Sequence, residues 1–172
     1  KYRNPDESVE IIEVTTYRSE AHYTDYRHPE KVEFVSELSL DLARRDFTIN
    51  ALAMNAKGEI YDFFDGQKDL NTGIIRTVGN PHDRFNEDAL RLMRAVRFAT
   101  QLDFTIEENT LEAMKSLAPH LSHIAQERIR DELTKMMNTP RAMSGYILLK
   151  DTGLLSYSIP ELLEGVGVEQ NG

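Results

Sequence analysis

The sequence contains no cysteine and no long apolar run. Without thiols, the chain can form neither a disulfide framework nor a thiolate zinc site, and this absence agrees with a reducing compartment. No apolar segment approaches the roughly 20 residues that a membrane-spanning helix requires. Residues 1–10 are polar and lack the apolar region of a signal peptide. We therefore expect a cytoplasmic protein that makes no contact with a membrane.

Net positive charge is also lacking, since the formal charge at pH 7 is −9. Proteins that bind the phosphate backbone over a wide surface usually carry a net basic surface, so this charge argues against extensive nucleic-acid binding. Basic residues nevertheless cluster: Arg44 and Arg45 are adjacent, and Arg91, Arg94 and Arg97 follow at a spacing of three. Any contact with RNA is therefore expected to be local.

The length and composition fit one ordinary domain or two small units. Of the 172 residues, 40% are hydrophobic and 28% are charged, which is the balance of a globular protein. Residues 1–79 are rich in β-branched residues, aromatics and turn signals, whereas residues 80–172 follow a helical period. We therefore expect an α+β protein with a domain boundary near Asn80 and Pro81.

In the first part, the pattern predicts short strands and helices joined by turns. Residues 9–17 cluster Ile, Val and Thr and are expected to form a strand, whereas residues 19–29, with tyrosines, histidine and charges, are expected to form an exposed loop. A hairpin is predicted over residues 51–55 and 59–63, with Gly58 supplying the positive φ of its turn. Two short helices and a further strand are expected over residues 39–45, 67–71 and 74–78.

The second part is predicted to form a helical bundle. Pro81 lies where the first turn of a helix tolerates proline, and this helix is expected to run to about residue 102 with Glu87 and Asp88 in its early part. Further helices are expected over residues 107–117, 124–137 and 141–150, the last ended by Gly153.

The helix that contains Glu87 is predicted to have two chemically different faces. In an α-helix successive side chains are rotated by about 100°, and this places a set of apolar residues on one side of the expected helix. This apolar arc comprises Ala89, Leu92, Met93, Val96 and Ala99. Asp88, Arg91, Arg94 and Arg97 fan across the other side, where residues three apart are neighbours, so Asp88 could touch Arg91. An aspartate acceptor beside an arginine fork can match the edge of a nucleobase. Ordinary ion pairs on a solvated face explain the same spacing, and spacing alone favours them.

A second cluster, Arg44, Arg45 and Asp46, lies directly before an apolar run. The arginines could grip a phosphate while Asp46 orients them. Alternatively, this is the C-terminus of a helix, where cations interact favourably with the helix dipole. The residue pattern gives the two interpretations equal weight.

Two long motifs resemble one known family. Residues 44–53 read Arg-Arg-Asp-Phe-Thr-Ile-Asn-Ala-Leu-Ala, and residues 84–98 read Arg-Phe-Asn-Glu-Asp-Ala-Leu-Arg-Leu-Met-Arg-Ala-Val-Arg-Phe. Together with Glu-Val-Thr-Thr-Tyr-Arg at 13–18 and Ile-Ile-Arg-Thr-Val-Gly at 74–79, they resemble the class II tRNA nucleotidyltransferase and poly(A) polymerase family, in the same order and at similar separations. The resemblance covers nearly the whole chain and outweighs the interpretation of each cluster as ordinary surface charge.

The resemblance implies a role for each motif. Arg45 would contact the nucleotide, and Arg44 and Asp46 would order the site. Asp88 and Arg91 would pair with the base of incoming CTP or ATP.

Three further charged residues receive roles in the same way. Glu87 would support the base-reading pair, whereas Arg94 and Arg97 would bind the triphosphate or hold the helix in place. Glu127 and Arg128 resemble a later family motif with a structural role, and we expect them to be scaffolding.

The family fold implies a mixed β-sheet head of the nucleotidyltransferase type over residues 1–79, lacking its N-terminal part, and a helical neck and start of the body over residues 80–172. Residues 19–31 would be the flexible loop of the head. Enzymes that add only cytidines tend to lack this loop, so its presence favours complete CCA addition or A addition.

Catalysis in this family uses two aspartates after a Gly-Ser turn, and no Gly-Ser turn followed by Asp-x-Asp occurs in the sequence. We therefore expect an internal fragment, with the ligands of Mg²⁺ upstream. Glu13 is a candidate for the additional carboxylate beside that aspartate pair, and a solvated glutamate at a strand edge explains it equally well. His120 and His123 have no further ligands nearby in the sequence, which disfavours a metal site there.

The sequence therefore predicts CCA addition, the transfer of CMP and AMP from CTP and ATP to the tRNA 3′ end, with this chain supplying nucleotide selection. An A-adding or CC-adding enzyme or a poly(A) polymerase of the same family is an alternative. A non-catalytic nucleotide-binding or RNA-binding module is an alternative from another class. The sequence gives no indication of the oligomeric state.

Overall fold

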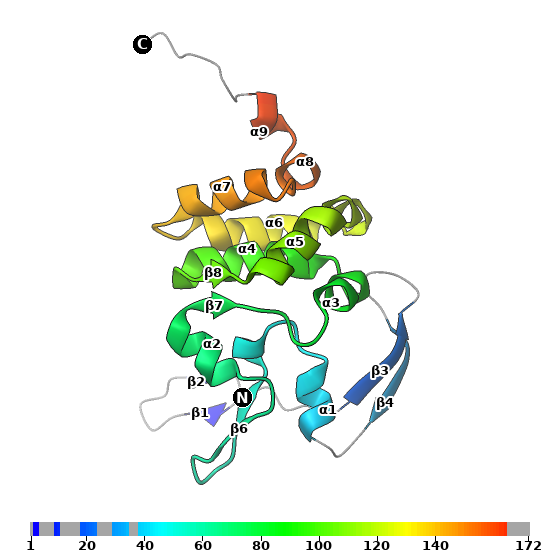
Figure 1. Cartoon of the computed structure of the whole chain (residues 1–172), viewed down its shortest axis with the longest axis vertical. Helices are drawn as coiled ribbons and strands as arrows, with labels where there is room; N and C mark the ends of the chain where they lie inside the picture. The colour runs from blue at the N-terminus through cyan, green and yellow to red at the C-terminus, as the bar shows by residue number, and fades with distance from the viewer. Residues whose placement is uncertain (1, 4–8, 11–17, 24–28, 35–37, 165–172) are drawn as a thin grey trace.

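The computed structural model describes residues 2–3, 9–10, 18–23, 29–34 and 38–164. Most of the described chain is helical. The helices are α1 (Leu38–Ala43), the 3₁₀ turn η1 (Thr48–Asn50), α2 (Gly66–Thr72), α3 (Pro81–Glu87), α4 (Leu90–Leu102), α5 (Glu108–Leu117), the 3₁₀ turn η2 (Ala118–His123), α6 (Gln126–Met137), α7 (Ala142–Asp151), α8 (Leu155–Ser158) and α9 (Glu161–Glu164). Figure 1 shows α4 to α9 layered along the longest axis, with α1 and α2 at the opposite end.

The described strands are short and pair two by two. The antiparallel pairs are β1 (Tyr2–Arg3) with β2 (Val9–Glu10), β3 (Arg18–Tyr23) with β4 (Pro29–Phe34), and β5 (Leu52–Met54) with β6 (Ile60–Asp62), whereas β7 (Ile74–Ile75) pairs in parallel with β8 (Thr105–Ile106). The architecture is α+β, as predicted. β8 was not predicted, because a two-residue strand leaves no period to detect.

Several local predictions are confirmed. The hairpin of β5 and β6 places Ala53 opposite Tyr61, and Gly58 in its turn has a φ of 83°. The expected strand over residues 74–78 is shorter than predicted and forms β7. The helices expected over residues 39–45, 67–71, 107–117, 124–137 and 141–150 are α1, α2, α5, α6 and α7, with bounds that differ by one or two residues.

The prediction of an exposed loop over residues 19–29 is wrong for the residues that the structure describes, 19–23 and 29, which lie in strands. Residues 18–23 form β3 and pair antiparallel with β4, with an irregular register around His22. Pro29, taken as the end of a loop, is the first residue of β4, a position where a strand tolerates proline. In its described part, the segment expected to be the flexible loop of the head consists of paired strands, and its mobility stays a prediction. Of the strand predicted over residues 9–17, only Val9 and Glu10 are described, and Glu13 lies outside the described residues.

The single helix predicted from Pro81 to residue 102 is also wrong, because the structure has two helices. Asn80 caps α3 by accepting a hydrogen bond from His82 N at 2.9 Å, and Pro81 occupies the first turn as expected. α3 ends at Glu87, and Asp88 has extended backbone angles, φ −149° and ψ 102°. The chain therefore changes direction inside the motif that the sequence presented as one continuous helix.

The core is built around α4. All five residues of the predicted apolar arc are buried, which confirms the helical period in this stretch: Ala89, Leu92, Met93, Val96 and Ala99. Phe47 and Ile75, from the first part of the chain, belong to the same buried cluster. Burying such side chains contributes about 1.5–3 kcal/mol each, so this shared core binds the two parts firmly together.

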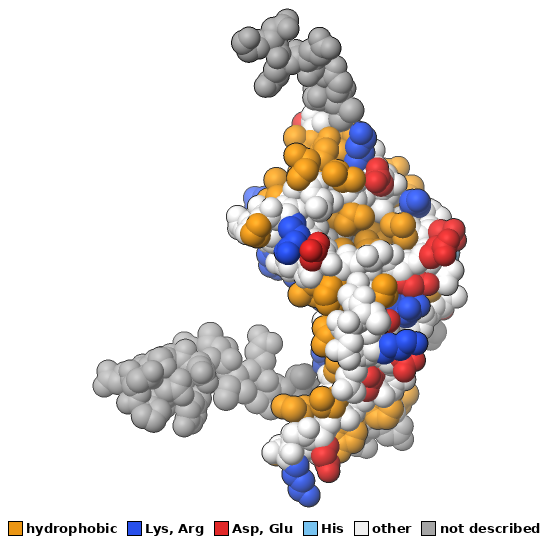
Figure 2. All heavy atoms as spheres, turned by 60° about the vertical axis from the view of Figure 1, so that its left-hand side comes forward, with side chains coloured by type: hydrophobic (Ala, Val, Ile, Leu, Met, Phe, Trp, Pro, Cys, Tyr) orange, Lys and Arg blue, Asp and Glu red, His pale blue; other side chains and the backbone are white. Residues whose placement is uncertain are grey.

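Apolar side chains remain exposed at the α7 to α9 end. Met137, Met143, Tyr146 and Leu162 line a shallow pocket of about 400 Å³. Figure 2 shows hydrophobic side chains gathered over the upper part of this face. No helix in the described part of the chain is long and apolar enough to cross a lipid bilayer.

Candidate functional site

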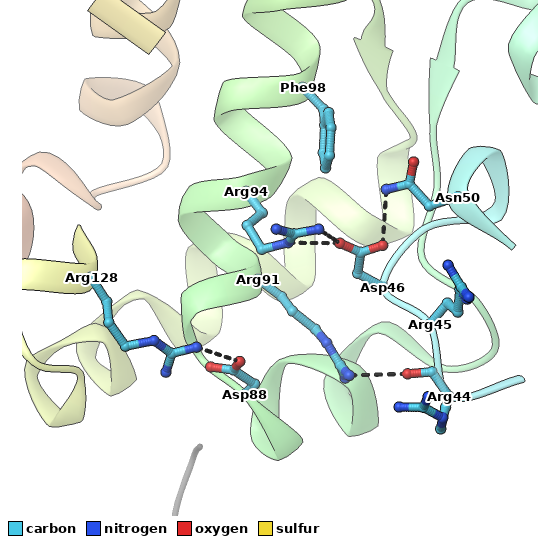
Figure 3. A pocket seen from close by; sticks show the side chains of 9 residues that line it. All are labelled: Arg44, Arg45, Asp46, Asn50, Asp88, Arg91, Arg94, Phe98 and Arg128. Carbon is cyan, nitrogen blue, oxygen red and sulfur yellow. Dashed lines mark hydrogen bonds and ion pairs between the residues drawn. The ribbon is translucent and has the colours of Figure 1, made fainter. Parts of the chain in front are cut away.

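A cavity of about 550 Å³ lies where the first part of the chain meets α4 and α6 (Figure 3). Nine residues line it: Arg44, Arg45, Asp46, Asn50, Asp88, Arg91, Arg94, Phe98 and Arg128. Five are arginines and two are aspartates, so this cavity is locally positive although the chain is acidic. Guanidinium groups bind phosphate oxygens through paired hydrogen bonds. The cavity therefore fits a polyanionic ligand such as a nucleoside triphosphate.

Asp46 orders the loop that follows α1. Its Oδ1 accepts hydrogen bonds from Phe47 N at 2.8 Å and from Asn50 Nδ2 at 3.0 Å. Its Oδ2 is contacted by Arg94 Nε at 2.7 Å and by Arg94 Nη2 at 2.5 Å. The side chain of Asp46 is only 8% exposed, and a buried carboxylate needs such partners. Asp46 thus joins the loop to α4.

Arg44 and Arg45 follow the last residue of α1 and share one carboxylate. Arg44 Nη2 lies 2.8 Å from Asp41 Oδ1, and Arg45 Nη2 lies 3.5 Å from Asp41 Oδ2. Burial raises the pKa of Asp41, but the hydrogen bond and charge of Arg44, with Arg45, outweigh it and hold this pKa below its usual range. The two arginines therefore lie just beyond a helix C-terminus and also line the cavity, which combines both interpretations of this cluster.

Arg45 is the more exposed of the two, with 45% of its side chain accessible. Arg44, at 22%, is held more closely against α1. A side chain that reaches solvent inside a positive cavity can meet a ligand without breaking packing. This difference suits the roles expected of the two arginines, with Arg45 at the nucleotide and Arg44 in support.

The interruption between helices α3 and α4 at Asp88 has a local cause. Asp88 Oδ1 accepts a hydrogen bond from Leu90 N at 3.0 Å, so its side chain satisfies an amide at the start of α4. Aspartate competes for backbone amides in this way and is therefore favoured at caps over helix interiors. The expected side-chain contact between Asp88 and Arg91 at helical spacing is wrong. Asp88 Oδ2 instead accepts a hydrogen bond from Arg128 Nη2 at 3.1 Å.

Arg91 is held by α3 and by the end of α1. Its Nη1 donates to Glu87 Oε2 at 2.6 Å and to Arg84 O at 2.9 Å, and its Nη2 donates to Arg44 O at 3.1 Å. A guanidinium has five N–H donors, so these three bonds leave two for a ligand in the cavity. Arg91 therefore has a fixed position and spare donors.

Glu87 holds two arginines at once. It forms ion pairs with Arg91 and with Arg84, and Arg84 Nη1 donates to Ala43 O at 3.1 Å. Burial lowers the pKa of Arg84, and the charge of Glu87 opposes that effect. Arg84 and Arg91 thus bind the last carbonyl oxygens around the end of α1, which fastens the Arg44 loop to α3 and α4.

Arg94 and Arg97 both lie near the ring of Phe98. The Arg94 guanidinium carbon is 5.3 Å from the ring centre and that of Arg97 is 3.9 Å from it, and Arg94 and Phe98 both line the cavity. Arg97 Nε contacts Glu132 Oε2 at 2.5 Å, and Arg97 Nη1 donates to Gln101 Oε1 at 2.8 Å. Arg97 does not belong to the cavity lining. Its position matches the second of its two expected roles, in which it holds the helix.

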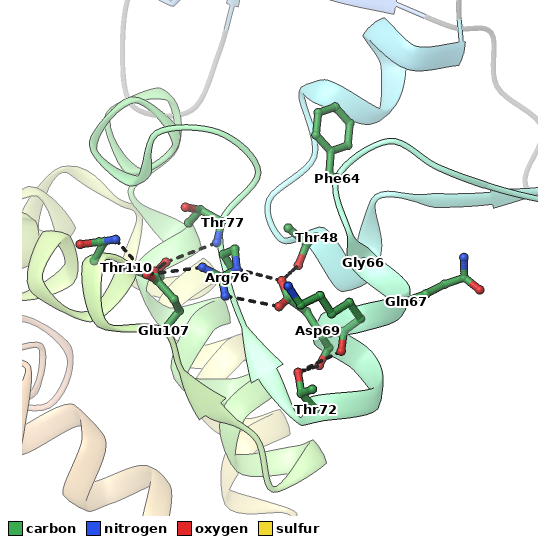
Figure 4. Close-up of polar contacts among 12 residues, drawn as sticks. Thr48, Phe64, Gly66, Gln67, Asp69, Thr72, Arg76, Thr77, Glu107 and Thr110 are labelled. Atoms are coloured by element: carbon green, nitrogen blue, oxygen red, sulfur yellow. Dashed lines mark hydrogen bonds and ion pairs between the residues drawn. The ribbon is translucent and has the colours of Figure 1, made fainter.

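A polar network links η1, α2 and the residue after β7, Arg76, to the N-terminus of α5 (Figure 4). Asp69, which is buried, accepts hydrogen bonds from Thr48 Oγ1 at 2.7 Å and from Arg76 Nε at 3.0 Å. Arg76 Nη1 lies 3.5 Å from Glu107 Oε1, and Glu107 caps α5 by accepting from Thr110 N at 2.9 Å. This network fixes η1, and with it the loop that carries Asp46.

Glu107 titrates at lower pH than an ordinary glutamate. Burial raises its pKa, but hydrogen bonds from the backbone and hydroxyl of Thr110 and the charge of Arg76 outweigh burial, so the pKa lies below 4.5. The carboxylate form is the form that caps α5.

The site contains residues that the sequence did not single out for binding. Arg128 was expected to be scaffolding, and Phe98 and Asn50 received no role of their own. Arg128 is 40 residues from Asp88, and no local spacing connects them. The two histidines lie with ring centres 6.3 Å apart, and the described residues contain no group of three or more His, Cys, Asp or Glu able to hold a metal ion.

Comparisons with known proteins agree with these motifs. Residues 3–76 match the description of a poly A polymerase head domain, and residues 103–165 match that of a probable RNA and SrmB-binding site of polymerase A. The CCA-adding enzyme of Limosilactobacillus reuteri is 55% identical over 148 residues, which are 84% of this chain and 36% of the relative. The chain thus spans about a third of the length of such curated relatives.

Solved structures give the same result. The crystal structure of the Bacillus stearothermophilus CCA-adding enzyme in complex with CTP is similar with a TM-score of 0.76 and 43% identity, covering 83% of this chain and 34% of that one. The Thermotoga maritima CCA-adding enzyme complexed with tRNA is similar with a TM-score of 0.66 and 33% identity, covering 72% of this chain and 31% of that one.

Proposed function

Because the chain belongs to the family of tRNA nucleotidyltransferases and poly(A) polymerases, we propose that the full-length protein adds CMP and AMP to the tRNA 3′ end from CTP and ATP. This chain supplies nucleotide selection. The observation that carries the proposal is the convergence of the Arg44 loop and the start of α4 on one positive cavity. The similar structure with bound CTP supports the choice of ligand.

In this proposal two arginines of the cavity, Arg45 and Arg94, bind the triphosphate. Arg45 lines the cavity with 45% of its side chain accessible, and Arg94, which also lines the cavity, is held by the buried Asp46. Arg44 and Asp46 order the loop. Arg97 holds α4 against α6 through Glu132, so it supports the site without contacting the ligand.

Asp88 and Arg91 select the base. An ionised carboxylate only accepts hydrogen bonds, and an arginine only donates them. Cytosine and adenine each present an amino group where uracil and guanine present a carbonyl oxygen, so a carboxylate placed there favours CTP and ATP. The wrong base would leave buried polar groups unpaired, which discriminates strongly. Glu87 holds Arg91 in position for this recognition.

Members of this nucleotidyltransferase family generally use Mg²⁺. The residues of the cavity do not fit a Mg²⁺ site, because its two carboxylates are engaged by arginines and the described residues lack any cluster of three potential ligands. We place the metal ligands on the part of the full-length protein that precedes Lys1, with Glu13 as a candidate additional carboxylate.

Two further proposals concern the whole protein. We propose that the head domain comprises residues 1–79 and the helical neck and start of the body residues 80–172, because Asn80 caps the N-terminus of α3 and the two family matches lie on either side of it. We also propose a cytoplasmic location, where tRNA, CTP and ATP are available together.

The test is extension of tRNAs that end before the first C, after the first C and after the second C of the CCA end, each supplied with one of the four nucleoside triphosphates. The full-length protein is expected to add C, C and A in that order. Addition of A alone would identify an A-adding enzyme, and long runs of A would identify a poly(A) polymerase. Nucleotide binding without any extension would identify a non-catalytic module and contradict the proposal.

A further inference from the structure

Arg128 contacts the residue that is proposed to read the base. It projects from the first turn of α6 into the cavity, and its Nη2 donates to Asp88 Oδ2 at 3.1 Å (Figure 3). The two side chains are partly shielded, with 31% of Arg128 and 19% of Asp88 exposed. A charge-assisted hydrogen bond in such a setting restrains the orientation of the carboxylate.

The contacts of Arg128 differ from those of the arginines that fasten the structure. Arg84 and Arg91 each donate to backbone carbonyl oxygens of other segments. Arg128 has no such bond among the described residues, and its Nη1 is buried there without a hydrogen-bond partner. A buried donor left unpaired costs about 1–3 kcal/mol, so this guanidinium is not placed for structural satisfaction alone.

Asp88 retains acceptor capacity for a base. Its Oδ1 accepts from Leu90 N and its Oδ2 accepts from Arg128. Two carboxylate oxygens together offer about four acceptor positions, so about two are left. With one oxygen bonded to α4 and the other to α6, rotation of the carboxylate is restrained, and Arg128 helps to set the direction of its remaining acceptor positions.

We propose that Arg128 is a positioning residue for nucleotide selection, which orients the Asp88 carboxylate toward the amino group of the incoming cytosine or adenine. This inference rests on the proposed function of the cavity. It predicts that Arg128 acts through Asp88, and that its loss changes which nucleotide is chosen as well as how fast the enzyme works.

The test uses four variants of the full-length protein: Arg128→Gln, Arg128→Lys, Asp88→Asn, and the double variant Arg128→Gln with Asp88→Asn. Single-nucleotide extension of a tRNA substrate gives kcat and KM for each of the four triphosphates. For Arg128→Gln we expect the ratio of kcat/KM for CTP over UTP to fall about ten-fold, the scale of one charge-assisted hydrogen bond. Arg128→Lys keeps a cationic donor and should lie between Arg128→Gln and the wild type.

The double variant separates positioning from scaffolding. If Arg128 acts through Asp88, Arg128→Gln should change the CTP over UTP ratio by less than about two-fold once Asp88 is Asn, because contacting residues are strongly non-additive. The matched control is Arg130→Gln, which removes an exposed arginine from the same helix. Arg130→Gln should retain the wild-type ratio.

Two results would overturn the inference. One is a wild-type CTP over UTP ratio in both Arg128→Gln and Arg128→Lys, with only kcat or stability reduced, which is the behaviour of a scaffolding residue. The other is an equal effect of Arg128→Gln with and without Asp88→Asn. Failure of the proposed function looks different, since the wild-type protein itself would then fail to extend tRNA with a preference for CTP and ATP.

Discussion

Arg94 and Asp46, which are 48 positions apart, are joined by contacts from Arg94 Nε at 2.7 Å and Nη2 at 2.5 Å to the same carboxylate oxygen. Each residue belongs to one of the two motifs that the sequence singled out. Their contact places the end of the Arg44 loop against the face of α4 and forms one wall of the cavity. The geometry of the site therefore depends on this pair.

Replacement of Asp46 by Ala should destabilise the protein. The change removes the acceptor for Phe47 N, Asn50 Nδ2 and Arg94 at once. We expect the free energy of unfolding to fall by about 2–3 kcal/mol, because the partners include a charged group and a buried amide, while Arg94 regains some contact with water. Urea unfolding of the full-length protein measures this. Asp131→Ala, at an exposed position on α6, is the control and should change the value by less than about 0.5 kcal/mol.

Arg94 and Arg97 should respond differently to replacement by Gln. Arg97→Gln breaks a shielded pair with Glu132, and we expect a loss of about 3 kcal/mol in unfolding free energy, at the low end for such pairs because Lys135 also contacts Glu132. The dissociation constant of the Arg97→Gln variant for CTP should remain within about two-fold of the wild-type value, since Arg97 lies outside the cavity lining.

Arg94→Gln should weaken CTP binding about ten-fold, the scale of one charged hydrogen bond to phosphate. Isothermal titration calorimetry with both full-length variants gives the comparison. Equal weakening of CTP binding by Arg94→Gln and Arg97→Gln would show that Arg97 contacts the triphosphate after all.

Gly66→Ala should disturb the support of the site. A Cβ at Gly66 would lie 2.2 Å from Thr48 O, a backbone atom of η1 that has little freedom to move. We expect a destabilisation of about 1–3 kcal/mol from overpacking, with weaker CTP binding because η1 carries the loop of Asp46. Gln67→Ala, one residue further in the same helix and exposed, is the control. Unchanged stability of Gly66→Ala in urea unfolding would mean that α2 and η1 move apart without cost.

Glu107 should contribute to the pH dependence of stability. Its pKa in the folded protein lies below the ordinary value of 4.5, so its stabilising effect is fully present above that value and is lost as the pH falls through the folded pKa. Glu107→Gln should therefore reduce stability most at neutral pH, and its difference from the wild type should shrink on acidification below about pH 4.5. Thermal unfolding from pH 7 downward measures this.

Glu108→Gln is the matched control for that series, since Glu108 is the next residue and is exposed. Its melting temperature should follow that of the wild type across the whole range. A difference between Glu107→Gln and the wild type that grows on acidification would contradict the assigned role of Glu107 as an ionised cap.

The sequence predicted those elements whose signals are local. The period of α5, α6 and α7, and the glycine in the turn between β5 and β6, needed no knowledge of distant contacts. β3 and β4 were missed because charged and aromatic residues resemble a loop when the pairing strand is unknown. The break at Asp88 was missed because its helical pattern continues on both sides, and only the side-chain bond to Leu90 N reveals the cap.

The same distinction between local and distant signals applies to the candidate site. The motif residues were identified from the sequence, and the structure brings Arg44, Arg45, Asp46, Asp88, Arg91 and Arg94 to one cavity. The partners of these residues were not foreseen, because the contacts of Asp88 with Arg128 and of Arg97 with Glu132 join residues 40 and 35 positions apart. Glu13 lies outside the described residues, and its role stays a prediction.

The most direct test of the central claim is nucleotide choice by the full-length Asp88→Asn variant. Asparagine can still cap α4, and its amide N–H can donate a hydrogen bond to the carbonyl oxygen of uracil or guanine. We predict that the variant still extends tRNA but that its preference for CTP over UTP falls at least about ten-fold in kcat/KM. A variant that extends tRNA with the wild-type preference among the four nucleotides would show that Asp88 does not read the base.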